Sequence, residues 1–266
     1  MKHELGFAEV LDARLRYEMM GSGHPVALIH GHTLDQRMWE DQFEAFAASF
    51  QVLQYDMRGY GRSSLPAGDY SQAADLKGLF DLLKIKRAHL VGLSLGGGVA
   101  LDFALAFPAM TAGLVLVDSV LPGRPWSTDF GEVFPILSQA GRAGDLAGAR
   151  KMWMNHGLFA PAMAVPAVAA QLGAMVESYS GWHWQNHNPA HHETEAIPAA
   201  LGRTAAPTLV VLGELDIPEF HHIAADLVGG IPNARLVTIQ GAGHMAPMEA
   251  PEAFNDAVLS FLRGIG

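Results

Sequence analysis

Apolar positions along the chain gather into short, nearly continuous runs that end in turn residues. Runs of this kind, rich in Val, Ile and Leu, are typical of parallel strands that are buried on both faces. The earlier segment 14–20 instead alternates apolar and polar positions, which predicts a more exposed strand. The runs that predict buried strands are 25–31, 50–56, 88–93, 113–119, 207–216 and 234–241.

Between these runs the apolar spacing changes to that of amphipathic helices. Segment 71–84 repeats apolar residues at i, i+3, i+4 and i+7, and Ser71 is placed to cap a helix there. The same spacing recurs from Phe254 to Phe261, where Pro251 suits a first helical turn. Strands that alternate with helices predict an α/β fold with a mostly parallel sheet that is covered on both faces.

Residues 122–206 interrupt this alternation. They contain no run that predicts a strand, are rich in Ala, Met, Trp and Pro, and include the helical segments 145–159 and 167–179. Strand-like sequence resumes directly afterwards. We therefore predict a core formed by 1–121 and 207–266, with a helical insertion that lies over one end of its sheet.

Composition narrows the class of protein. The chain has 266 residues, of which 50% are hydrophobic and 17% charged, so it can bury one large core. No apolar run approaches the roughly 18 residues of a membrane span, and the first 20 residues lack the apolar centre of a signal peptide. Cysteine is absent, which fits a reducing cytoplasm. The formal net charge of -10 disfavours nucleic-acid and anionic-membrane partners.

A single serine stands between glycines at the end of the run 88–93. Residues 92–96, Gly-Leu-Ser-Leu-Gly, match the pattern G-x-S-x-G and open a predicted helix over 95–107. Glycines beside a sharp strand-to-helix turn avoid steric collisions and leave the serine hydroxyl accessible. We therefore interpret Ser94 as a nucleophile rather than as part of an ordinary glycine-rich turn.

A serine nucleophile needs a histidine base that is oriented by an acid. His244 follows the last strand-like run and precedes the terminal helix, where such a base is expected. Asp216 ends the run 207–216 and is the preferred acid. Asp118, at the end of another run, is the competing acid, and Glu214 is a poorer candidate.

The negative oxygen that forms when serine attacks a carbonyl needs hydrogen-bond donors. The backbone N–H of Leu95, at the start of a helix and next to the serine, is the first predicted donor. The backbone N–H of His32, in the His-Gly-His turn after the first buried run, is the second.

Other motifs indicate neither a metal nor an organic cofactor. His183 and His187 stand four residues apart, but no third ligand accompanies them and Asn-His-Asn-Pro is poor helix sequence. Segment 56–64 is glycine-rich but lacks the phosphate-loop pattern G-x-x-x-x-G-K. We therefore expect no metal and no cofactor, and interpret 181–192 as part of a pocket wall.

Four segments resemble, in order, the signatures of α/β-hydrolase-fold enzymes over almost the whole chain. They are HGHTLD at 30–35, YDMRGYGRSS at 55–64, VGLSLGGG at 91–98 and GAGHMAPMEAP at 241–251. Ser94, Asp216 and His244 also follow the nucleophile–acid–base order of that family. The resemblance implies an eight-stranded, mostly parallel sheet with helices on both faces and a helical cap at 122–206.

Within that family, segment 30–42 is similar to 3-oxoadipate enol-lactonases and related small esterases. The resemblance implies a hydrolase that cleaves a small carboxylic ester or lactone through an acyl-enzyme. A meta-cleavage C–C hydrolase, a cofactor-free perhydrolase and a ligand-binding receptor that keeps the triad remain open as alternatives. Serine at position 94 disfavours epoxide hydrolases and haloalkane dehalogenases, whose nucleophile is a carboxylate.

The scarcity of charge in 122–206 predicts a substrate that is an apolar or aromatic small molecule. Four tryptophans of that segment are the candidate wall residues of its pocket, although their directions do not follow from the sequence. They are Trp126, Trp153, Trp182 and Trp184. The identity of the substrate and the oligomeric state stay open.

Overall fold

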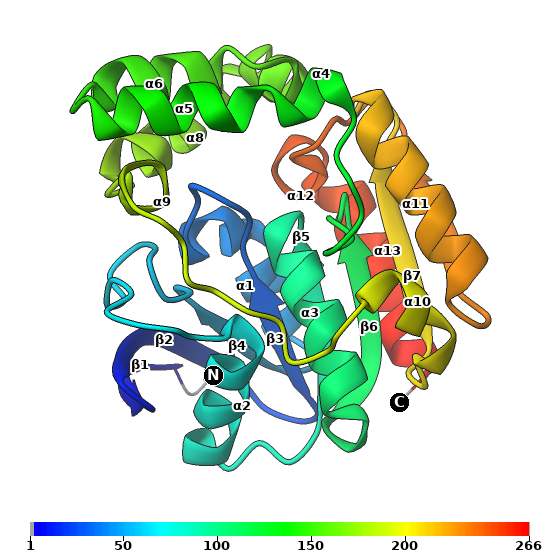
Figure 1. Cartoon of the computed structure of the whole chain (residues 1–266). Helices are drawn as coiled ribbons and strands as arrows, with labels where there is room; N and C mark the ends of the chain where they lie inside the picture. The colour runs from blue at the N-terminus through cyan, green and yellow to red at the C-terminus, as the bar shows by residue number, and fades with distance from the viewer. Residues whose placement is uncertain (1–2, 266) are drawn as a thin grey trace.

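The computed structural model describes residues 3–265, so positions 1, 2 and 266 of the expected core lie outside the described part (Figure 1). Its eight strands form one sheet in the order β1-β2-β4-β3-β5-β6-β7-β8. The pairs β1–β2 and β2–β4 are antiparallel, and the other neighbours are parallel. The strands are β1 His3–Val10, β2 Ala13–Gly21, β3 Pro25–Ile29, β4 Gln51–Tyr55, β5 Ala88–Leu93, β6 Thr111–Val117, β7 Thr208–Gly213 and β8 Arg235–Ile239.

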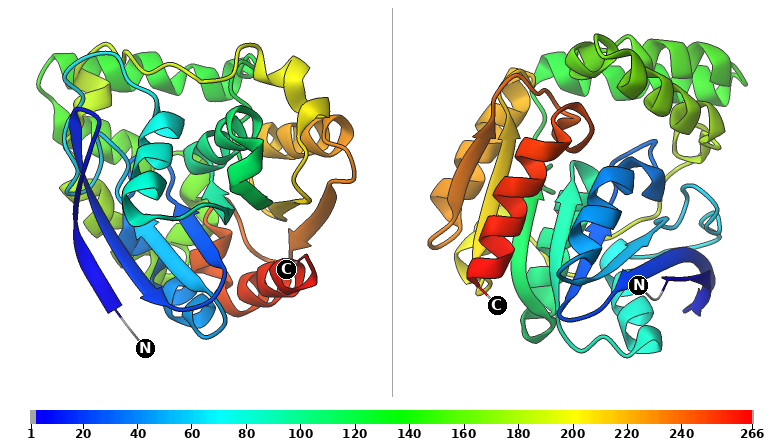
Figure 2. Two further views of the ribbon diagram at one scale, coloured as in Figure 1. Left: turned by 90° about the horizontal axis from the view of Figure 1, so that it is seen from below. Right: turned by 180° about the vertical axis from the view of Figure 1, so that it is seen from behind.

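Helices cover both faces of this sheet (Figures 1 and 2). Helices α1 and α13 pack together on one face, and α2, α3 and α11 lie on the other. Strands β5, β6 and β7 are therefore buried along their whole length, as their continuous apolar runs predicted. The core helices are α1 Glu40–Ala47, α2 Gln72–Leu83, α3 Leu95–Ala106, α11 Pro218–Gly230, α12 Ala246–Glu249 and α13 Pro251–Gly264.

The predicted helix signals lie where helices begin. Ser71 caps α2, because its hydroxyl accepts a hydrogen bond from the backbone N–H of Ala74 at 3.2 Å. Pro251 occupies the first turn of α13, whose apolar face buries Phe254 and Val258. The α/β fold class inferred from the alternation of strands and helices is confirmed.

Residues between β6 and β7 form a helical layer above one end of the sheet (Figure 1). Its helices are short, and α5 packs against both α6 and α9. They are α4 Thr128–Gly131, α5 Val133–Arg142, α6 Leu146–Met154, α7 Ala160–Met163, α8 Pro166–Ser178, α9 Trp182–Gln185 and α10 Ile197–Ala200. Short 3-10 turns also occur at Gln36–Trp39 (η1), Pro108–Met110 (η2), Gly157–Phe159 (η3) and Leu201–Arg203 (η4). Within residues 3–265, no helix combines the length and the apolar content that crossing a bilayer requires.

Three strand expectations need correction. No run predicted β1, whose buried residues Ala8 and Val10 lie at its end while Leu5 is 63% exposed. Because β1 pairs with β2, the latter is not an edge strand and buries more than its alternation suggested, including Leu15. Strand β8 was expected to be buried on both faces but is largely exposed, with Leu236 47% accessible, because it pairs only with β7 at the sheet edge.

Candidate active site

The turn between β5 and α3 holds Ser94 in a strained backbone conformation. Its φ is 52° and its ψ is -114°, a region that costs a non-glycine residue about 1–3 kcal/mol. A Cβ atom added at Gly96 would lie 2.1 Å from the carbonyl oxygen of Ile29, and one at Gly92 would lie 2.2 Å from that of Gly96. Only glycine fits at these two positions, so the G-x-S-x-G spacing reflects close backbone contact.

His244 lies in the loop between β8 and α12, and Asp216 lies just after β7. The imidazole Nδ1 donates a hydrogen bond to Asp216 Oδ2 at 2.8 Å, and both side chains are buried. The other oxygen of Asp216 accepts from the backbone N–H of Ile217 at 2.7 Å. Because an ionised carboxylate only accepts, the Nδ1 atom carries the proton and Nε2 is left with its lone pair. This is the tautomer that a general base requires.

Asp118 lies beside this pair but does not hold the imidazole. Its Oδ1 accepts from the backbone N–H of Gly213 at 2.8 Å, and within the described residues its buried Oδ2 has no partner. Burial, and then the nearby Asp216 carboxylate, raise the pKa of the Asp118 carboxyl well above its ordinary value. Glu214 is exposed and accepts from the backbone N–H of Gly241. Of the three acids considered from the sequence, Asp216 is the one hydrogen-bonded to His244.

The ligand-type atoms of Asp118, Asp216 and His244 all lie within 4.8 Å of one another. A cation could use His244 only through a free nitrogen lone pair. The Nδ1 atom of His244 is already donating to Asp216. The donor set therefore fits an imidazole–carboxylate pair better than a metal ion.

Glu249 holds the loop that carries His244, and its role did not follow from the sequence pattern. Its two carboxylate oxygens accept from the backbone N–H groups on either side of the histidine, Gly243 at 2.6 Å and Met245 at 2.9 Å. Burial raises the pKa of the Glu249 carboxyl. The signal was present as an acidic residue five positions after His244, inside the segment 241–251.

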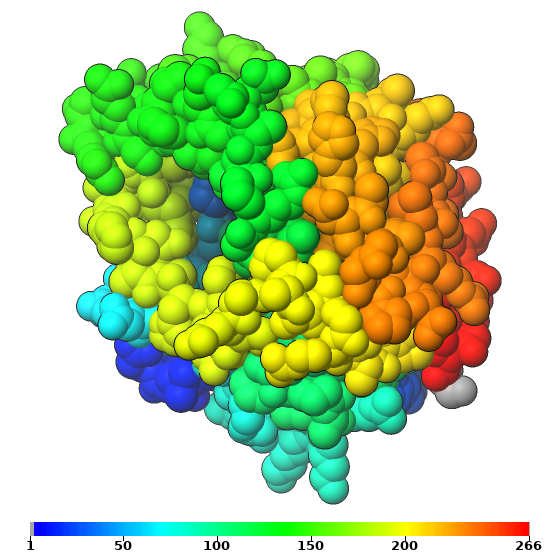
Figure 3. All heavy atoms as spheres, turned by 45° about the vertical axis from the view of Figure 1, so that its right-hand side comes forward, coloured from blue at the N-terminus to red at the C-terminus, as the bar shows by residue number. Residues whose placement is uncertain are grey.

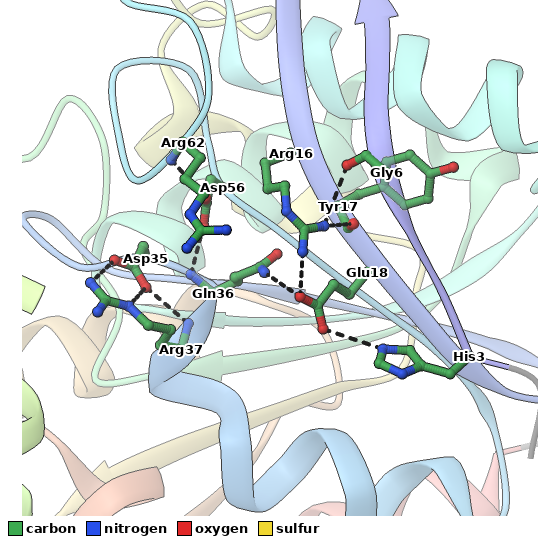
Figure 4. Close-up of polar contacts among 10 residues, drawn as sticks. All are labelled: His3, Gly6, Arg16, Tyr17, Glu18, Asp35, Gln36, Arg37, Asp56 and Arg62. Atoms are coloured by element: carbon green, nitrogen blue, oxygen red, sulfur yellow. Dashed lines mark hydrogen bonds and ion pairs between the residues drawn. The ribbon is translucent and has the colours of Figure 1, made fainter.

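The two backbone N–H groups predicted to face a negative oxygen are unpaired. Among residues 3–265, neither His32 nor Leu95 donates its backbone N–H to another residue. Both residues line the cavity that Ser94 also lines. Asp56 fixes the neighbouring loops, because it accepts from the backbone N–H groups of Gln36 at 2.9 Å and Arg62 at 2.8 Å (Figure 4).

The cavity between the sheet and the helical layer has a volume of about 330 Å³, near the lower end of the range for small-molecule sites. Figure 3 shows a hollow in the surface between green and yellow-green parts of the 122–206 segment, with blue atoms at its bottom. The cavity brings Ser94 and His244 together. Its other lining residues are mostly aromatic or aliphatic: Leu34, Tyr60, Leu93, Val120, Trp126, Phe130, Phe134, Trp153, Leu158, Phe159, Trp184, Phe220 and Met245.

Three of the four predicted tryptophans line this cavity, namely Trp126, Trp153 and Trp184. Trp182 is not among the lining residues, and its ring packs on His183 at a centroid distance of 5.0 Å. Trp153 also donates its indole N–H to Thr33 Oγ1 at 2.8 Å. This bond ties the helical layer to the loop that carries His32, a link that the sequence pattern did not predict.

His183, considered as a metal ligand from its spacing to His187, is instead hydrogen-bonded to tyrosines. The Tyr179 hydroxyl accepts from the His183 backbone N–H at 3.2 Å and is hydrogen-bonded to the His183 Nδ1 at 2.8 Å. The ring stacks on Tyr60 at 4.6 Å, and the Tyr60 hydroxyl lies 2.8 Å from His32 Nδ1. This aromatic group joins the helical layer to the core beside the cavity.

A model of the alpha/beta hydrolase family matches residues 26–257. The chain belongs to this family. One relative, the 2-hydroxy-6-oxononadienedioate/2-hydroxy-6-oxononatrienedioate hydrolase of Paraburkholderia xenovorans (strain LB400), is 31% identical over 271 residues, covering 94% of this chain and 91% of the relative. The family membership confirms the inferred α/β-hydrolase resemblance and makes this protein a hydrolase.

Solved structures of hydrolases agree with this assignment. A hydrolase from Pseudomonas aeruginosa PA01 shares 32% identity with a TM-score of 0.84, over 97% of this chain and 98% of that one. The enol-lactonase from Burkholderia xenovorans LB400 shares 25% identity with a TM-score of 0.85, over 97% of this chain and 100% of that one. This alpha/beta hydrolase is therefore similar over nearly its whole length to enzymes of known structure.

Proposed function

We propose that this alpha/beta hydrolase cleaves a small carboxylic ester or lactone through an acyl-enzyme on Ser94. The observation that carries the proposal is the buried hydrogen bond from His244 Nδ1 to Asp216. The same histidine lines the cavity that Ser94, with its strained backbone, also lines. Similarity to an enol-lactonase structure supports the same class of substrate. Serine, histidine and aspartate in this relation constitute a nucleophile, a base and an orienting acid.

In the first half-reaction, the Ser94 Oγ attacks the carbonyl carbon while His244 Nε2 takes the hydroxyl proton. Asp216 stabilises the imidazolium that results. The tetrahedral intermediate collapses as the bond to the leaving oxygen breaks, and His244 returns the proton to that oxygen. In the second half-reaction, water attacks the acyl carbon with the same base, and the carboxylic acid leaves as Ser94 regains its proton.

The unpaired backbone N–H groups of His32 and Leu95 are the proposed oxyanion hole. Removing one such donor typically lowers turnover by ~10²–10³. We also propose that 122–206 acts as a cap that closes over the bound substrate, since its side chains form one wall of the cavity. No metal or organic cofactor takes part in the proposed steps. The lack of cysteine is compatible with a cytoplasmic location, which we retain as part of the proposal.

A C–C bond hydrolase is the second candidate, and it is favoured by the 31% identity to a 2-hydroxy-6-oxononadienedioate hydrolase. It would use the same serine and histidine. A perhydrolase or a receptor on this fold has no comparable observation in its favour. Product analysis on a 1,5-diketone beside an ester panel separates the first two activities.

The decisive experiment is intact mass spectrometry after exposure to a fluorophosphonate, with turnover of 4-nitrophenyl acetate measured in parallel. Wild type should gain one adduct and hydrolyse the ester, whereas Ser94→Ala should do neither while keeping its circular dichroism spectrum. A folded wild type that gains no adduct and shows no turnover would refute the serine-hydrolase proposal.

A further inference from the structure

The wall of the cavity beside Ser94 carries no fixed charge. Within the described residues 3–265, the lining includes no lysine, arginine, aspartate or glutamate. Apart from the indole N–H groups of its tryptophans, its polar side chains are hydroxyl, amide and imidazole groups: His32, Tyr60, Ser94, Ser138, His183, Asn188 and His244. A charged substrate group would therefore find no counter-ion there.

Basic side chains of the 122–206 segment are engaged elsewhere or face solvent. Arg124 pairs with Glu219 at 2.6 Å, and Arg150 donates to the backbone carbonyl of Tyr179 at 2.8 Å. The remaining ones are exposed on the surface: Arg142, Lys151 and Arg203. The cap therefore has no spare cation that could reach a bound anion without breaking an existing contact or leaving solvent.

The two imidazoles beside the catalytic pair are also neutral at physiological pH. Burial lowers the pKa of His183 to about 4. Burial, with His183 and His30 nearby, lowers the pKa of His32 to about 3. Their hydrogen-bond partners are uncharged tyrosine hydroxyls, so no nearby carboxylate stabilises the charged form.

The remaining wall opposes an anion in a second way. Ring faces carry negative electrostatic potential, which attracts cations and repels anions. Trp126, Phe130 and Phe134 contact one another at centroid distances of 5.0–6.0 Å on the cap side. Phe220 closes the wall near His244, at 4.3 Å from its ring. A carboxylate placed here would lose its hydration and gain no ion pair, which disfavours its binding.

We propose that this cavity accepts esters or lactones whose bound groups are uncharged and excludes those that carry an additional carboxylate. This inference rests on the proposed function. It predicts that the dicarboxylate in the name of the Paraburkholderia relative is not a substrate of this chain, despite the shared family. The same holds for 3-oxoadipate enol-lactone, which carries a free carboxylate.

The test compares two phenyl acetates with the same number of heavy atoms, one with a para-isopropyl group and one with a para-carboxylate. Acetate release is followed in a pH-stat with wild type, and each rate is divided by that of hydroxide hydrolysis. We expect the normalised kcat/KM of the isopropyl ester to exceed that of the carboxylate by at least 100-fold. The ratio should persist at 0.5 M NaCl, which screens surface charge but not a desolvated site.

A variant that adds a positive charge to the cavity wall provides the complementary test, with a neutral variant at the same position as its control. Ser138 lies on α5, lines the cavity and is half-buried. Ser138→Arg should raise the normalised kcat/KM of the carboxylate ester at least tenfold above that of Ser138→Met, a neutral side chain that also extends into the cavity. The isopropyl ester should not gain from the arginine.

Equal turnover of the two esters by wild type would overturn the charge selection and leave the proposed hydrolase intact. A ratio that disappears at high salt would assign the discrimination to the net surface charge and would also overturn it. Turnover of neither ester, together with no fluorophosphonate adduct, would instead refute the proposed function on which the inference rests.

Discussion

Two regions meet at the cavity and hold their side chains by different interactions. On the core side, Ser94 is fixed by a strained turn, and Asp216 and Glu249 are fixed by backbone N–H donors. On the cap side, the wall is built by ring packing, and Trp126 remains 40% exposed. Hydrogen-bond geometry tolerates little change, whereas an apolar wall can be rebuilt from other apolar residues. We therefore expect the core side to determine the reaction type and the cap side to determine the choice of substrate.

Substitution of the two buried carboxyls of the core, Asp216 and Asp118, should give the largest difference in kcat. Asp216→Asn should lower kcat on the order of 10⁴-fold, because the amide can donate and no longer holds His244 in the required tautomer. Asp118→Asn should stay within about tenfold of wild type, since it does not contact the imidazole. Steady-state kinetics with 4-nitrophenyl acetate measures both. A larger loss in Asp118→Asn would move the role of the acid to Asp118.

The tryptophans of the cap should differ in how much they contribute to the free energy of unfolding. Trp153→Ala should lower the free energy of unfolding by about 3–5 kcal/mol, because the side chain is 3% exposed and its indole bonds Thr33. Trp126→Ala, on the same cavity, should cost much less stability because the ring is partly exposed. Urea denaturation gives both values. Equal losses would show that the cap wall is as tightly fixed as the core.

Replacing one glycine of the core and one glycine of the cap by alanine compares how closely the backbone is packed in the two regions. Gly96→Ala should cost about 1–3 kcal/mol or more, because the added methyl meets the Ile29 carbonyl. Gly173→Ala lies inside α8 with no atom within 4 Å of the added methyl, so it should stabilise by about 0.5–1 kcal/mol. Thermal unfolding tests both signs. A stabilising Gly96→Ala would contradict the close packing of the turn that carries Ser94.

Features of the core could be predicted where they depend on the order of nearby residues in the sequence. Buried parallel strands produce continuous apolar runs, and a sharp strand-to-helix turn needs glycines at fixed spacing, so β5 and the turn at Ser94 could be located from the sequence alone. Strand β1 could not, because its apolar residues occupy both faces. Glu249 and the bond from Trp153 to Thr33 were also missed, since each depends on a loop or helix whose direction the sequence pattern does not encode.

The smallest predicted effect concerns the aromatic contact that joins the two regions. His183 has a folded-state pKa of about 4, below its ordinary value of 6.5, because burial disfavours the charged ring. Between these values the unfolded chain binds more protons, so the contribution of His183 to the free energy of unfolding is complete above pH 6.5 and is lost as the pH falls towards 4.

Substitution of His183 tests this linkage. His183→Gln stays neutral and should flatten the decline of the unfolding free energy between pH 6.5 and 4, measured by urea denaturation at several pH values. His222→Gln, on the exposed surface, removes one histidine without touching the contact to Tyr60 and should leave the decline unchanged. An equal decline in wild type and His183→Gln would mean that the cap does not exclude water from this imidazole. His183 would then not count as a neutral side chain of the cavity wall.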